Sequence, residues 1–462
     1  MKQQLAQLKQ QYSQQPYPDA AKRIQWLQAL DKAIRQYSDK LCQAISIDFS
    51  HRSLDESRLL EVMPSLSGIA YQIKHVKRWM KLKKRKVHYS YLPASNYILP
   101  QPLGVVGIIV PWNYPLFLAV GPLMAALAAG NKAMLKLSEF TPATNKVIKE
   151  MLAHFLPDQV IVIEGDAQVA ADFSSLAFDH LLFTGSSHIG KKVMQAAAAN
   201  LTPVTLELGG KSPAIISKDA NIVSAVQRLL FGKTANAGQT CVAPDYVLLP
   251  RQQLDTFIQQ AQRCFEQFYP RGVRGEDYSA VINQQQFSRL QAYLTEAANK
   301  QAEIISLDKQ NWQQASQQKL APQLVINAPL DCAVWQQEIF GPILPIMLYD
   351  TIEQAIEFIN QQPRPLALYL FSSNKTLQQQ IMQQTHAGGV CINDTLMHVG
   401  QDDLPFGGIG PSGMGAYHGE AGFLTFSHQK AIHKKGRFSS GSFIYPPFKR
   451  GLFQLIMKWL LR

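Results

Sequence analysis

The chain has 462 residues, and its 45 Lys and Arg against 33 Asp and Glu give a formal net charge of +12. With 46% hydrophobic and 17% charged residues it can bury large cores, which excludes intrinsic disorder as a global description. The five cysteines are an odd number without a C-x-x-C pair, which excludes a disulfide-stapled secreted module and argues against a zinc site. The positive charge is compatible with three kinds of partner: nucleic acid, a membrane surface, or no specific partner.

Residues 1–80 predict helices, because apolar residues recur there at helical spacing. The N-terminus has no apolar core of the secretory type, and we expect a reducing, cytoplasmic location. The basic stretch 74–88 is more typical of a solvated helix end than of a nucleic-acid site. Residues 89–103 alternate with prolines, as an edge hairpin does.

The longest uncharged stretch, 104–131, is long enough to cross a bilayer, which takes about 20 apolar residues. Two prolines and an asparagine, Pro111, Asn113 and Pro115, interrupt it in the middle. The β-branched run 105–110 favours a buried strand, and 116–129 favours a buried helix. The pattern therefore predicts strand, turn and helix instead of a membrane span.

From residue 104 onward, short β-rich runs alternate with helical patterns, which predicts an α/β fold with largely parallel sheets. No period repeats along the chain, so a solenoid is excluded. The predicted strands after 104–110 are 132–137, 160–166, 180–186, 203–210 and 213–217, followed by a second series at 246–250, 279–283, 320–327, 344–349, 366–372 and 388–393.

Two segments carry candidate reactive groups. Cys241 lies among small residues in AGQTCV, where its thiolate would be a strong nucleophile, although a lone cysteine is more often a buried small hydrophobe. Glu207 ends a predicted strand before two glycines. It would serve as a general base if burial raised its pKa, and the alternative is a cap or an ion pair.

Two further segments suggest binding groups. The run 183–190, FTGSSHIG, follows a strand and opens a helix, as a phosphate-binding turn does. It holds only Gly185 and Gly190, so it is not the usual G-x-G-x-x-G pattern. Asn113 is held between two prolines and would be a rigid donor to an oxyanion, or else part of a simple turn.

Taken together and in this order, these segments resemble the aldehyde dehydrogenase superfamily over about residues 10–435. CVAPDY (241–246) and VCIND (390–394) resemble its class 3 branch, and DFSHRS (48–53) resembles a bacterial subgroup similar to coniferyl aldehyde dehydrogenase. The matching motifs are PWNYP (111–115), KLSEFTP (136–142), GD (165–166), FTGS (183–186), ELGGKSP (207–213), GQTCVAPDY (238–246), EIFGPILPI (338–346) and PFGGIGPSGMGAYHG (405–419).

The resemblance implies a mechanism. Cys241 would attack the aldehyde carbonyl, and the Asn113 side chain with the Cys241 backbone N–H would hold the oxyanion of the thiohemiacetal. Hydride transfer to a nicotinamide would leave a thioester, which water activated by Glu207 would hydrolyse to the acid. No metal is implied. A relative that passes its thioester to coenzyme A does not need this base, so Glu207 favours hydrolysis.

The resemblance also implies binding residues. The cofactor would be NAD, with NADP open, because Glu139 can accept a hydrogen bond from a ribose 2′-hydroxyl. His188, in the first helical turn beside the pyrophosphate, would be either a phosphate contact or a plain surface residue. The cofactor contacts would be Lys136, Glu139, Gly185, Ser186, Gly190, Glu338 and Phe340, and the substrate pocket would hold Tyr114 and Asn393, with Phe117 and Met397 making it apolar.

The implied architecture is a Rossmann-type cofactor domain (1–80 and 104–207), an α/β catalytic domain (208–395) and a small bridging β-element (81–103 and 416–433) used in a homodimer. The substrate would be an aromatic aldehyde such as coniferyl aldehyde, or a medium-chain aliphatic one. The tail, 434–462, is basic and amphipathic, and would either lie on a membrane surface or dock on protein. The alternatives are a coenzyme-A-acylating enzyme and a non-catalytic basic protein that binds membranes or nucleic acid.

Overall fold

The computed structural model describes residues 1–309, 313–314, 318–437, 445–448 and 451–461. The first 80 residues are helical, as predicted, and the Asp19 side chain caps the long second helix by accepting the Lys22 N–H at 2.8 Å. One turn, η1, is a π-helix, a form that often marks functional sites. The helices are α1 (Lys2–Gln14), α2 (Ala20–Asp48), α3 (Leu54–Ser57), η1 (Arg58–Val62) and α4 (Met63–Trp79).

The first large sheet has the strand order β17-β7-β6-β3-β4-β5, parallel except for β17. The stretch 104–131 forms strand β3, a turn and the fully buried helix α5, so the expectation of strand, turn and helix is confirmed. The elements are β3 (Val105–Ile109), α5 (Phe117–Ala129), β4 (Lys132–Lys136), α6 (Pro142–Phe155), β5 (Val160–Ile163), α7 (Ala167–Ser174), β6 (His180–Thr184), α8 (Ser187–Ala198), β7 (Val204–Glu207) and β17 (Gly413–Met414).

The second large sheet has the order β10-β13-β14-β9-β8-β15-β16, again parallel except at one edge, β10. Its strands are β8 (Pro213–Ile216), β9 (Tyr246–Pro250), β10 (Glu303–Ser306), β13 (Gln323–Ile326), β14 (Ile343–Tyr349), β15 (Ala367–Phe371) and β16 (Gly389–Ile392). Its helices are α9 (Ile222–Thr234), α10 (Leu254–Phe268), α11 (Gln284–Asn299), α12 (Ala333–Gln336), α13 (Ile352–Gln361) and α14 (Lys375–Gln384). Short turns η3 (Ala235–Gly238), η4 (Arg251–Gln253) and η5 (Gly272–Arg274) and the pair β11 (Gln313–Gln314) and β12 (Lys319–Leu320) complete this region.

One strand prediction is wrong. Residues 279–282 are buried, which explains the apolar pattern, but the predicted segment 279–283 forms no strand. Their main-chain groups bond elsewhere: Ala280 donates its N–H to His51 O at 2.8 Å, and the Gln239 side chain bonds both Ala280 O and the Ile282 N–H. The segment therefore supports the loop before Cys241 instead of pairing in the sheet.

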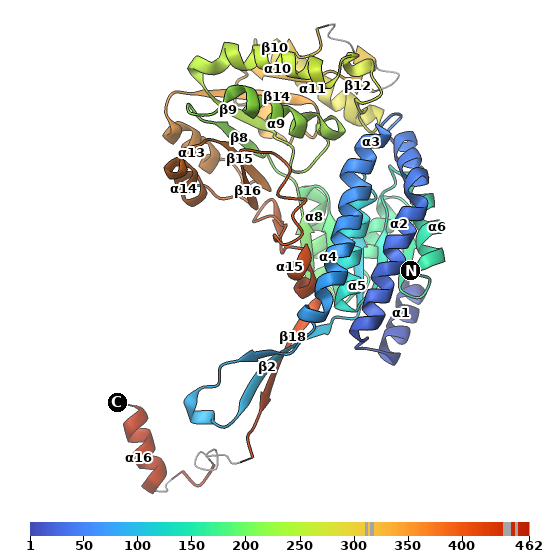
Figure 1. Cartoon of the computed structure of the whole chain (residues 1–462), viewed down its shortest axis with the longest axis vertical. Coiled ribbons are helices and arrows are strands. Elements are labelled where there is room, and N and C mark those ends of the chain that lie inside the picture. Colours follow the sequence, from blue (N-terminus) through green and yellow to red (C-terminus); the bar gives the residue numbers. More distant parts are fainter. Residues whose placement is uncertain (310–312, 315–317, 438–444, 449–450, 462) are drawn as a thin grey trace.

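A third, antiparallel sheet consists of β1 (Lys83–Arg85), β2 (Ser95–Pro102) and β18 (Ser427–Lys434). The turn η2 (Tyr89–Tyr91) lies between β1 and β2 in the chain. In Figure 1 its strands β2 and β18 form an arm that leaves the body of the molecule at the bottom of the view. The segment predicted as the second half of the bridging element, 416–433, is divided in two. Helix α15 (Gly419–Thr425) packs on α4 and α5, and β18 alone enters the arm and runs to Lys434.

The tail ends in helix α16 (Gly451–Leu460), drawn beyond the arm in Figure 1. Within the described ranges, no helix combines the length and the apolar composition that are needed to cross a membrane.

Candidate active site

The topology of the first sheet points to a ligand site at one edge. Strand β3 lies between β4 and β6, and the chain proceeds outward from it to β5 on one side and to β7 on the other. In parallel sheets the helices on either side of such a switch point leave a crevice at the carboxyl ends of the strands. Residues 111–113 follow β3 and 185–186 follow β6, so both predicted binding turns flank this crevice.

A cavity of about 240 Å³ lies at this place and combines residues from both large sheets. It brings together seven residues that the sequence singled out: Asn113, Gly185, Ser186, Glu207, Cys241, Glu338 and Phe340. Its other lining residues are Pro111, Trp112, Thr184, Gly209, Gln286 and Arg289. Gln286 and Arg289 were not predicted to line this site, because helix α11 carries none of the recognised motifs.

Cys241 follows a turn in which Asn236 and Ala237 adopt a positive φ of 50° each, a conformation that costs energy for residues with a Cβ. The thiol is half-buried, and burial together with Glu338 and Glu207 raises its pKa to about 12. The N–H groups of Cys241 and Val242 oppose this rise. Without a positive group beside it the thiol stays protonated at neutral pH, so the nucleophile needs a base or a cation nearby.

Glu207 ends β7 and is 2% exposed. Neither of its carboxylate oxygens has a hydrogen-bond partner among the residues that the structure describes. Burial raises its pKa well above the ordinary value. A buried carboxylate that is left without donors, and that faces the same cavity as a thiol, has the environment of a general base near neutral pH.

Asn113 is 3% exposed and its position is fixed through its main chain. Its carbonyl accepts hydrogen bonds from Arg52 at 3.0 Å and from the Asn236 side chain at 2.9 Å. Its own side-chain Nδ2 donates to Gln239 O at 3.1 Å, within the loop that precedes Cys241. The amide is therefore held next to the cysteine loop, and a second N–H of Nδ2 is left to bind an oxyanion.

Glu338 approaches the cavity from the second sheet, and burial, helped by Asp245, raises the pKa of its carboxyl to about 8. A Cβ built on Gly209 would come within 2.0 Å of Glu338 Oε2, so glycine at 209 makes room for this carboxylate. Phe340 stands edge-on to Trp112 with ring centroids 5.3 Å apart. These two rings and Glu338 form one wall of the cavity.

Helix α8 begins at the cavity, and the Ser186 side chain caps it by accepting the Ile189 N–H at 3.4 Å. The first turn of α8 contains no acidic residue, so its N-terminus is free to attract an anion. His188 is exposed on this turn. Gly190 does not line the cavity: it is buried, and a Cβ there would lie 2.6 Å from Leu208, so its role is close packing of α8 on the sheet.

Lys136 and Glu139 lie beyond the cavity, at the carboxyl end of β4. The buried Lys136 Nζ lies 3.8 Å from Glu139 Oε2 and donates to Leu137 O at 2.7 Å. Glu139 keeps 37% of its side chain exposed. The exposed Glu139 carboxylate therefore lies beside a buried ammonium, one strand away from the cavity.

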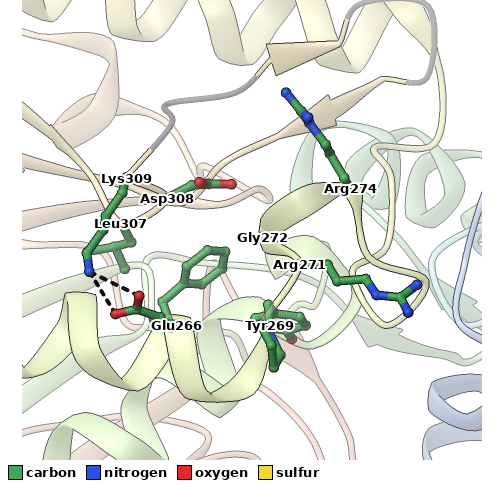
Figure 2. A pocket seen from close by; sticks show the side chains of 10 residues that line it. Glu266, Tyr269, Arg271, Gly272, Arg274, Leu307, Asp308 and Lys309 are labelled. Atoms are coloured by element: carbon green, nitrogen blue, oxygen red, sulfur yellow. Dashed lines mark hydrogen bonds and ion pairs between the residues drawn. The ribbon is translucent and has the colours of Figure 1, made fainter.

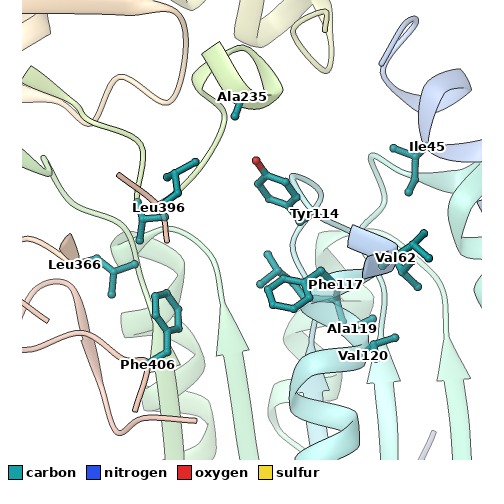
Figure 3. Packing of buried hydrophobic residues seen from close by; sticks show 14 of the residues in the cluster. Ile45, Val62, Tyr114, Phe117, Ala119, Val120, Ala235, Leu366, Leu396 and Phe406 are labelled. Atoms are coloured by element: carbon teal, nitrogen blue, oxygen red, sulfur yellow. The ribbon is translucent and has the colours of Figure 1, made fainter. Parts of the chain in front are cut away.

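The predicted substrate residues differ in their surroundings. The Tyr114 hydroxyl bonds Thr240 Oγ1 at 2.8 Å, and Figure 3 shows the Tyr114 and Phe117 rings across from Leu366, Leu396 and Phe406. Asn393 does not line the Cys241 cavity, because its side-chain amide donates to Ser372 O and accepts the Ser372 N–H, both at 2.9 Å. Met397 is 42% exposed.

A buried histidine that the sequence analysis did not single out lies among these apolar rings. His418 stacks on Phe406 with centroids 5.3 Å apart and lies 6.3 Å from Phe117. Its two ring nitrogens have no partner within the described ranges. Its φ of 106° is rare for a residue other than glycine. The motif run 405–419 contains it, but a motif does not show which member is buried.

A separate cavity of about 260 Å³ holds none of these groups. Figure 2 shows Arg271, Arg274 and Lys309 around it, with Lys309 bonded to Glu266 at 2.9 Å and 3.0 Å. The described residues that line it include no cysteine, serine or threonine and none of the motif residues. Among the described residues, no three His, Cys, Asp or Glu side chains are grouped so that they could hold a metal ion.

Comparison with known proteins identifies the family of the chain. The family model described as "Aldehyde dehydrogenase family" matches residues 4–432. A probable coniferyl aldehyde dehydrogenase of Pseudomonas aeruginosa is 52% identical over 452 residues, which are 98% of this chain and 94% of that relative. Further relatives named as members of aldehyde dehydrogenase family 3 come from a plant and from mammals, so the resemblance to class 3 is confirmed.

Two solved structures extend the match to the fold. The substrate-bound AldH of Staphylococcus aureus is 38% identical, covers 99% of both chains and superposes with a TM-score of 0.93. A Mycobacterium tuberculosis aldehyde dehydrogenase complexed with NAD+ is 27% identical, covers 93% of this chain and 88% of that one, and has a TM-score of 0.83. The predicted fold class is confirmed, and the chain belongs to the aldehyde dehydrogenase family.

Proposed function

We propose that this aldehyde dehydrogenase oxidises an aromatic aldehyde to the carboxylic acid with NAD, through a thioester on Cys241. The observation that carries the proposal is the pairing of Cys241 with Glu207 in one cavity, where the Glu207 carboxylate is buried and accepts no hydrogen bond within the described part of the chain. An enzyme that only binds aldehydes has no need of a buried carboxylate without a partner. An enzyme that hydrolyses a thioester at neutral pH does need a base.

In the proposed reaction the Cys241 thiol releases its proton to solvent, and the thiolate adds to the aldehyde carbon, whose carbonyl oxygen becomes an oxyanion. Asn113 Nδ2 and the main-chain N–H of Cys241 donate to that oxygen. A bound nicotinamide would supply the acceptor for the hydride of the aldehyde carbon, and loss of that hydride would convert the thiohemiacetal on Cys241 to a thioester. Glu207 then takes a proton from water, whose oxygen attacks the thioester, and the acid leaves as the thiol of Cys241 is reprotonated. The balance is aldehyde, NAD+ and water giving acid, NADH and a proton.

The residues present fit a dinucleotide. The acid-free N-terminus of α8 would face its pyrophosphate, and Glu338 would accept from the nicotinamide ribose while Phe340 packs beside the ring. Glu139 and Lys136 would bind the adenosine ribose. NAD is favoured over NADP because a 2′-phosphate would meet the Glu139 carboxylate. The solved complex of the tuberculosis relative with NAD+ supports the same assignment.

The substrate side favours a flat apolar aldehyde. Tyr114, Phe117, Phe406 and Leu396 gather there, and His418 adds two nitrogens that could bond a hydroxyl on an aromatic ring. The name of the 52% identical relative points to coniferyl aldehyde, which is aromatic and carries a phenolic hydroxyl. A medium-chain aliphatic aldehyde is the second candidate, since the same rings are apolar.

A panel of aldehydes tests the proposal. The kcat/KM of the purified chain is compared for coniferyl aldehyde, benzaldehyde and aliphatic aldehydes of increasing length, with NAD and NADP in parallel. We expect the largest value for an aromatic aldehyde with NAD, and free acid as the product whether or not coenzyme A is added. Acyl-CoA as the product would contradict the role of Glu207, and a preference for long aliphatic chains would contradict the aromatic assignment.

We also propose that the chain is a homodimer joined through the arm of β1, β2 and β18, with the cofactor and catalytic domains bounded as the sequence predicts. The arm stands away from both large sheets and ends in exposed aromatic residues, among them Tyr89 and Tyr91 at 61% and 59% exposure. Light scattering coupled to gel filtration would give the mass. A monomer at micromolar concentration would contradict the proposal.

Finally, we propose that the enzyme is cytoplasmic and touches membranes peripherally through its tail. Helix α16 carries Lys458 and leaves Leu455 and Trp459 at least 70% exposed, and Leu461 directly after it is 78% exposed. Such a helix can lie in the interface of an anionic bilayer. In a pelleting assay, the full chain should sediment with anionic liposomes more than with neutral ones, and a chain ending at Pro447 should stay in the supernatant. Trp459→Ser is the matched point variant and should sediment less than the full chain. Equal partitioning of all three would contradict the proposal.

A further inference from the structure

A buried charged network lies behind the catalytic cavity, on a segment that carries no catalytic motif. Arg52 and Glu61 have fully buried side chains, and Glu56 keeps 13% of its side chain exposed. Glu56 comes from α3 and Glu61 from the π-helical turn η1, at the start of the chain. None of the three lines the cavity that contains Cys241. Burying charged side chains costs free energy unless each charge is paired, so a functional role would explain why this network is present.

The first branch of the network holds the loop of Asn113. Arg52 Nη1 donates to Asn113 O at 3.0 Å and to Glu61 Oε1 at 2.8 Å. The other carboxylate oxygen of Glu61 accepts the N–H groups of Leu116 at 2.8 Å and Phe117 at 3.1 Å. The Arg52 guanidinium also lies over the Tyr114 ring, 4.7 Å from its centroid. Two charges thus bond both ends of the turn that presents Asn113.

The second branch reaches the loop of Cys241. Glu56 Oε1 accepts the Asn236 N–H at 2.8 Å, in the turn with positive φ. The Asn236 side chain donates to the same Asn113 carbonyl at 2.9 Å. Arg52 Nε donates to Glu56 Oε2 at 3.4 Å, which connects the second branch to the first. The loop after β3 and the loop before Cys241 are therefore tied to one another through Arg52 and Glu56.

We propose that Arg52, with Glu56 and Glu61, is a positioning residue that sets the Asn113 amide relative to Cys241. The inference rests on the proposed role of Asn113 as the donor to the oxyanion. The two loops belong to different sheets, so their relative position is not set by a shared strand. Charge-assisted hydrogen bonds from a third segment supply that constraint, and donors to an oxyanion must be held within a few tenths of an ångström.

The position of Asn113 matters in the transition state, where the negative charge on oxygen develops. Arg52→Lys keeps one charge but cannot bond Asn113, Glu56 and Glu61 at once, because an ammonium lacks the planar fork of the guanidinium. We expect kcat for aldehyde oxidation to fall roughly 10-fold to 100-fold in this variant, with KM changed less than threefold. A residue that only stabilised the fold would lower the amount of active enzyme and leave kcat per active site intact.

A double-mutant cycle tests the coupling directly. Pre-steady-state hydride transfer and kcat are measured, per titrated Cys241, for the wild type, Arg52→Lys, Asn113→Ala and the double variant. If Arg52 acts through Asn113, Arg52→Lys slows the wild type but slows the Asn113→Ala background by no more than about twofold. Equal fold-changes in both backgrounds would overturn the inference. Full activity of Asn113→Ala would instead refute the proposed role of Asn113, and with it the inference.

Arg23 provides the matched control. It is equally buried, and it bonds Pro18 O at 3.0 Å, Ala128 O at 3.1 Å and Ala129 O at 2.7 Å, all main-chain carbonyls away from the cavity. Arg23→Lys should lower the Tm comparably to Arg52→Lys and leave kcat per Cys241 unchanged. If Arg52→Lys does not fold, Glu56→Gln replaces it in the cycle with the same expectation. A kcat that falls equally in Arg23→Lys would overturn the inference.

Discussion

Two buried glutamates in this enzyme have opposite surroundings. Glu207, at 2% exposure, faces the cavity, and within the described structure its two oxygens accept no hydrogen bond. Glu61, fully buried behind the cavity, accepts from Arg52 and from two main-chain N–H groups. Burial raises the pKa of both carboxyls, but only for Glu61 do a cation and donors oppose the rise.

The difference teaches how one residue type serves two purposes. A carboxylate whose oxygens already accept hydrogen bonds from a cation and from N–H groups is fixed in place, so it can hold loops together. A carboxylate without donors holds its proton up to a higher pH and can exchange it with water, so it can work as a base. Comparing the two regions therefore gives predictions that differ in sign as well as in size.

The largest effect is expected on the cavity side. Cys241→Ala removes the nucleophile, and kcat should fall by about 10⁴-fold or more. NAD binding, followed by quenching of tryptophan fluorescence, should be kept, because the proposed cofactor contacts do not include the thiol. Retained turnover in this variant would end the assignment of the nucleophile.

Glu207→Gln should come next. Without the base, steady-state kcat should fall roughly 10²-fold to 10⁴-fold, while the first turnover of NADH persists. A base works only when deprotonated, so the wild-type rate should rise with pH through the raised pKa of Glu207. The residual rate of the variant should lack that rise. A pH–rate profile of both enzymes between pH 5 and 9 checks this, and identical profiles would argue against Glu207 as the base.

Stability should move in opposite directions at the two sites. Glu61→Gln removes the partner of a buried Arg52, and the free energy of unfolding should fall by about 3 kcal/mol. Glu207→Gln should instead stabilise the enzyme at alkaline pH. The raised pKa of Glu207 means that its favourable contribution is complete below its unfolded pKa of about 4.3 and is lost as pH rises through the folded value.

Urea unfolding at pH 6 and pH 8.5 checks both signs. The advantage of Glu207→Gln over the wild type should grow between the two pH values, while the loss in Glu61→Gln should be present at both. A Glu207→Gln variant less stable than the wild type at pH 8.5 would show that Glu207 has partners that the account omits.

The smallest effect is expected at the cofactor's far end. Glu139→Gln removes the like charge that a 2′-phosphate would meet, and kcat/KM with NADP should rise by about threefold to tenfold relative to NAD. Glu139 is substantially exposed, so solvent screening limits the change. An unaltered ratio would place the 2′-position away from this side chain.

Much of the fold could be predicted from sequence. Alternating apolar runs predicted the strands β3 through β9. The family resemblance predicted that Asn113, Glu207, Cys241 and Glu338 share one site, and the structure has all four in one cavity. The stretch 279–283 failed because burial and strand pairing leave the same apolar signature, and a glutamine side chain took its main-chain bonds. Pattern alone does not separate these outcomes.

The supporting residues were beyond prediction for a different reason. Arg52 bonds a residue 61 positions away, and no periodicity records such a pairing. Gly190 lies four residues after the FTGS motif and Asn393 lies within VCIND, yet the structure gives them packing and loop-bracing contacts. A motif identifies the segment that carries chemistry, whereas burial and hydrogen bonds show which of its members are free to perform it.

The central claim is that Glu207 releases the acid from a thioester on Cys241. Intact-mass spectrometry of Glu207→Gln, quenched in acid after mixing with NAD and an aromatic aldehyde, tests it most directly. We predict stoichiometric addition of the acyl group, mapped to Cys241, together with one equivalent of NADH. An unmodified chain that still turns over at the wild-type rate would contradict the account.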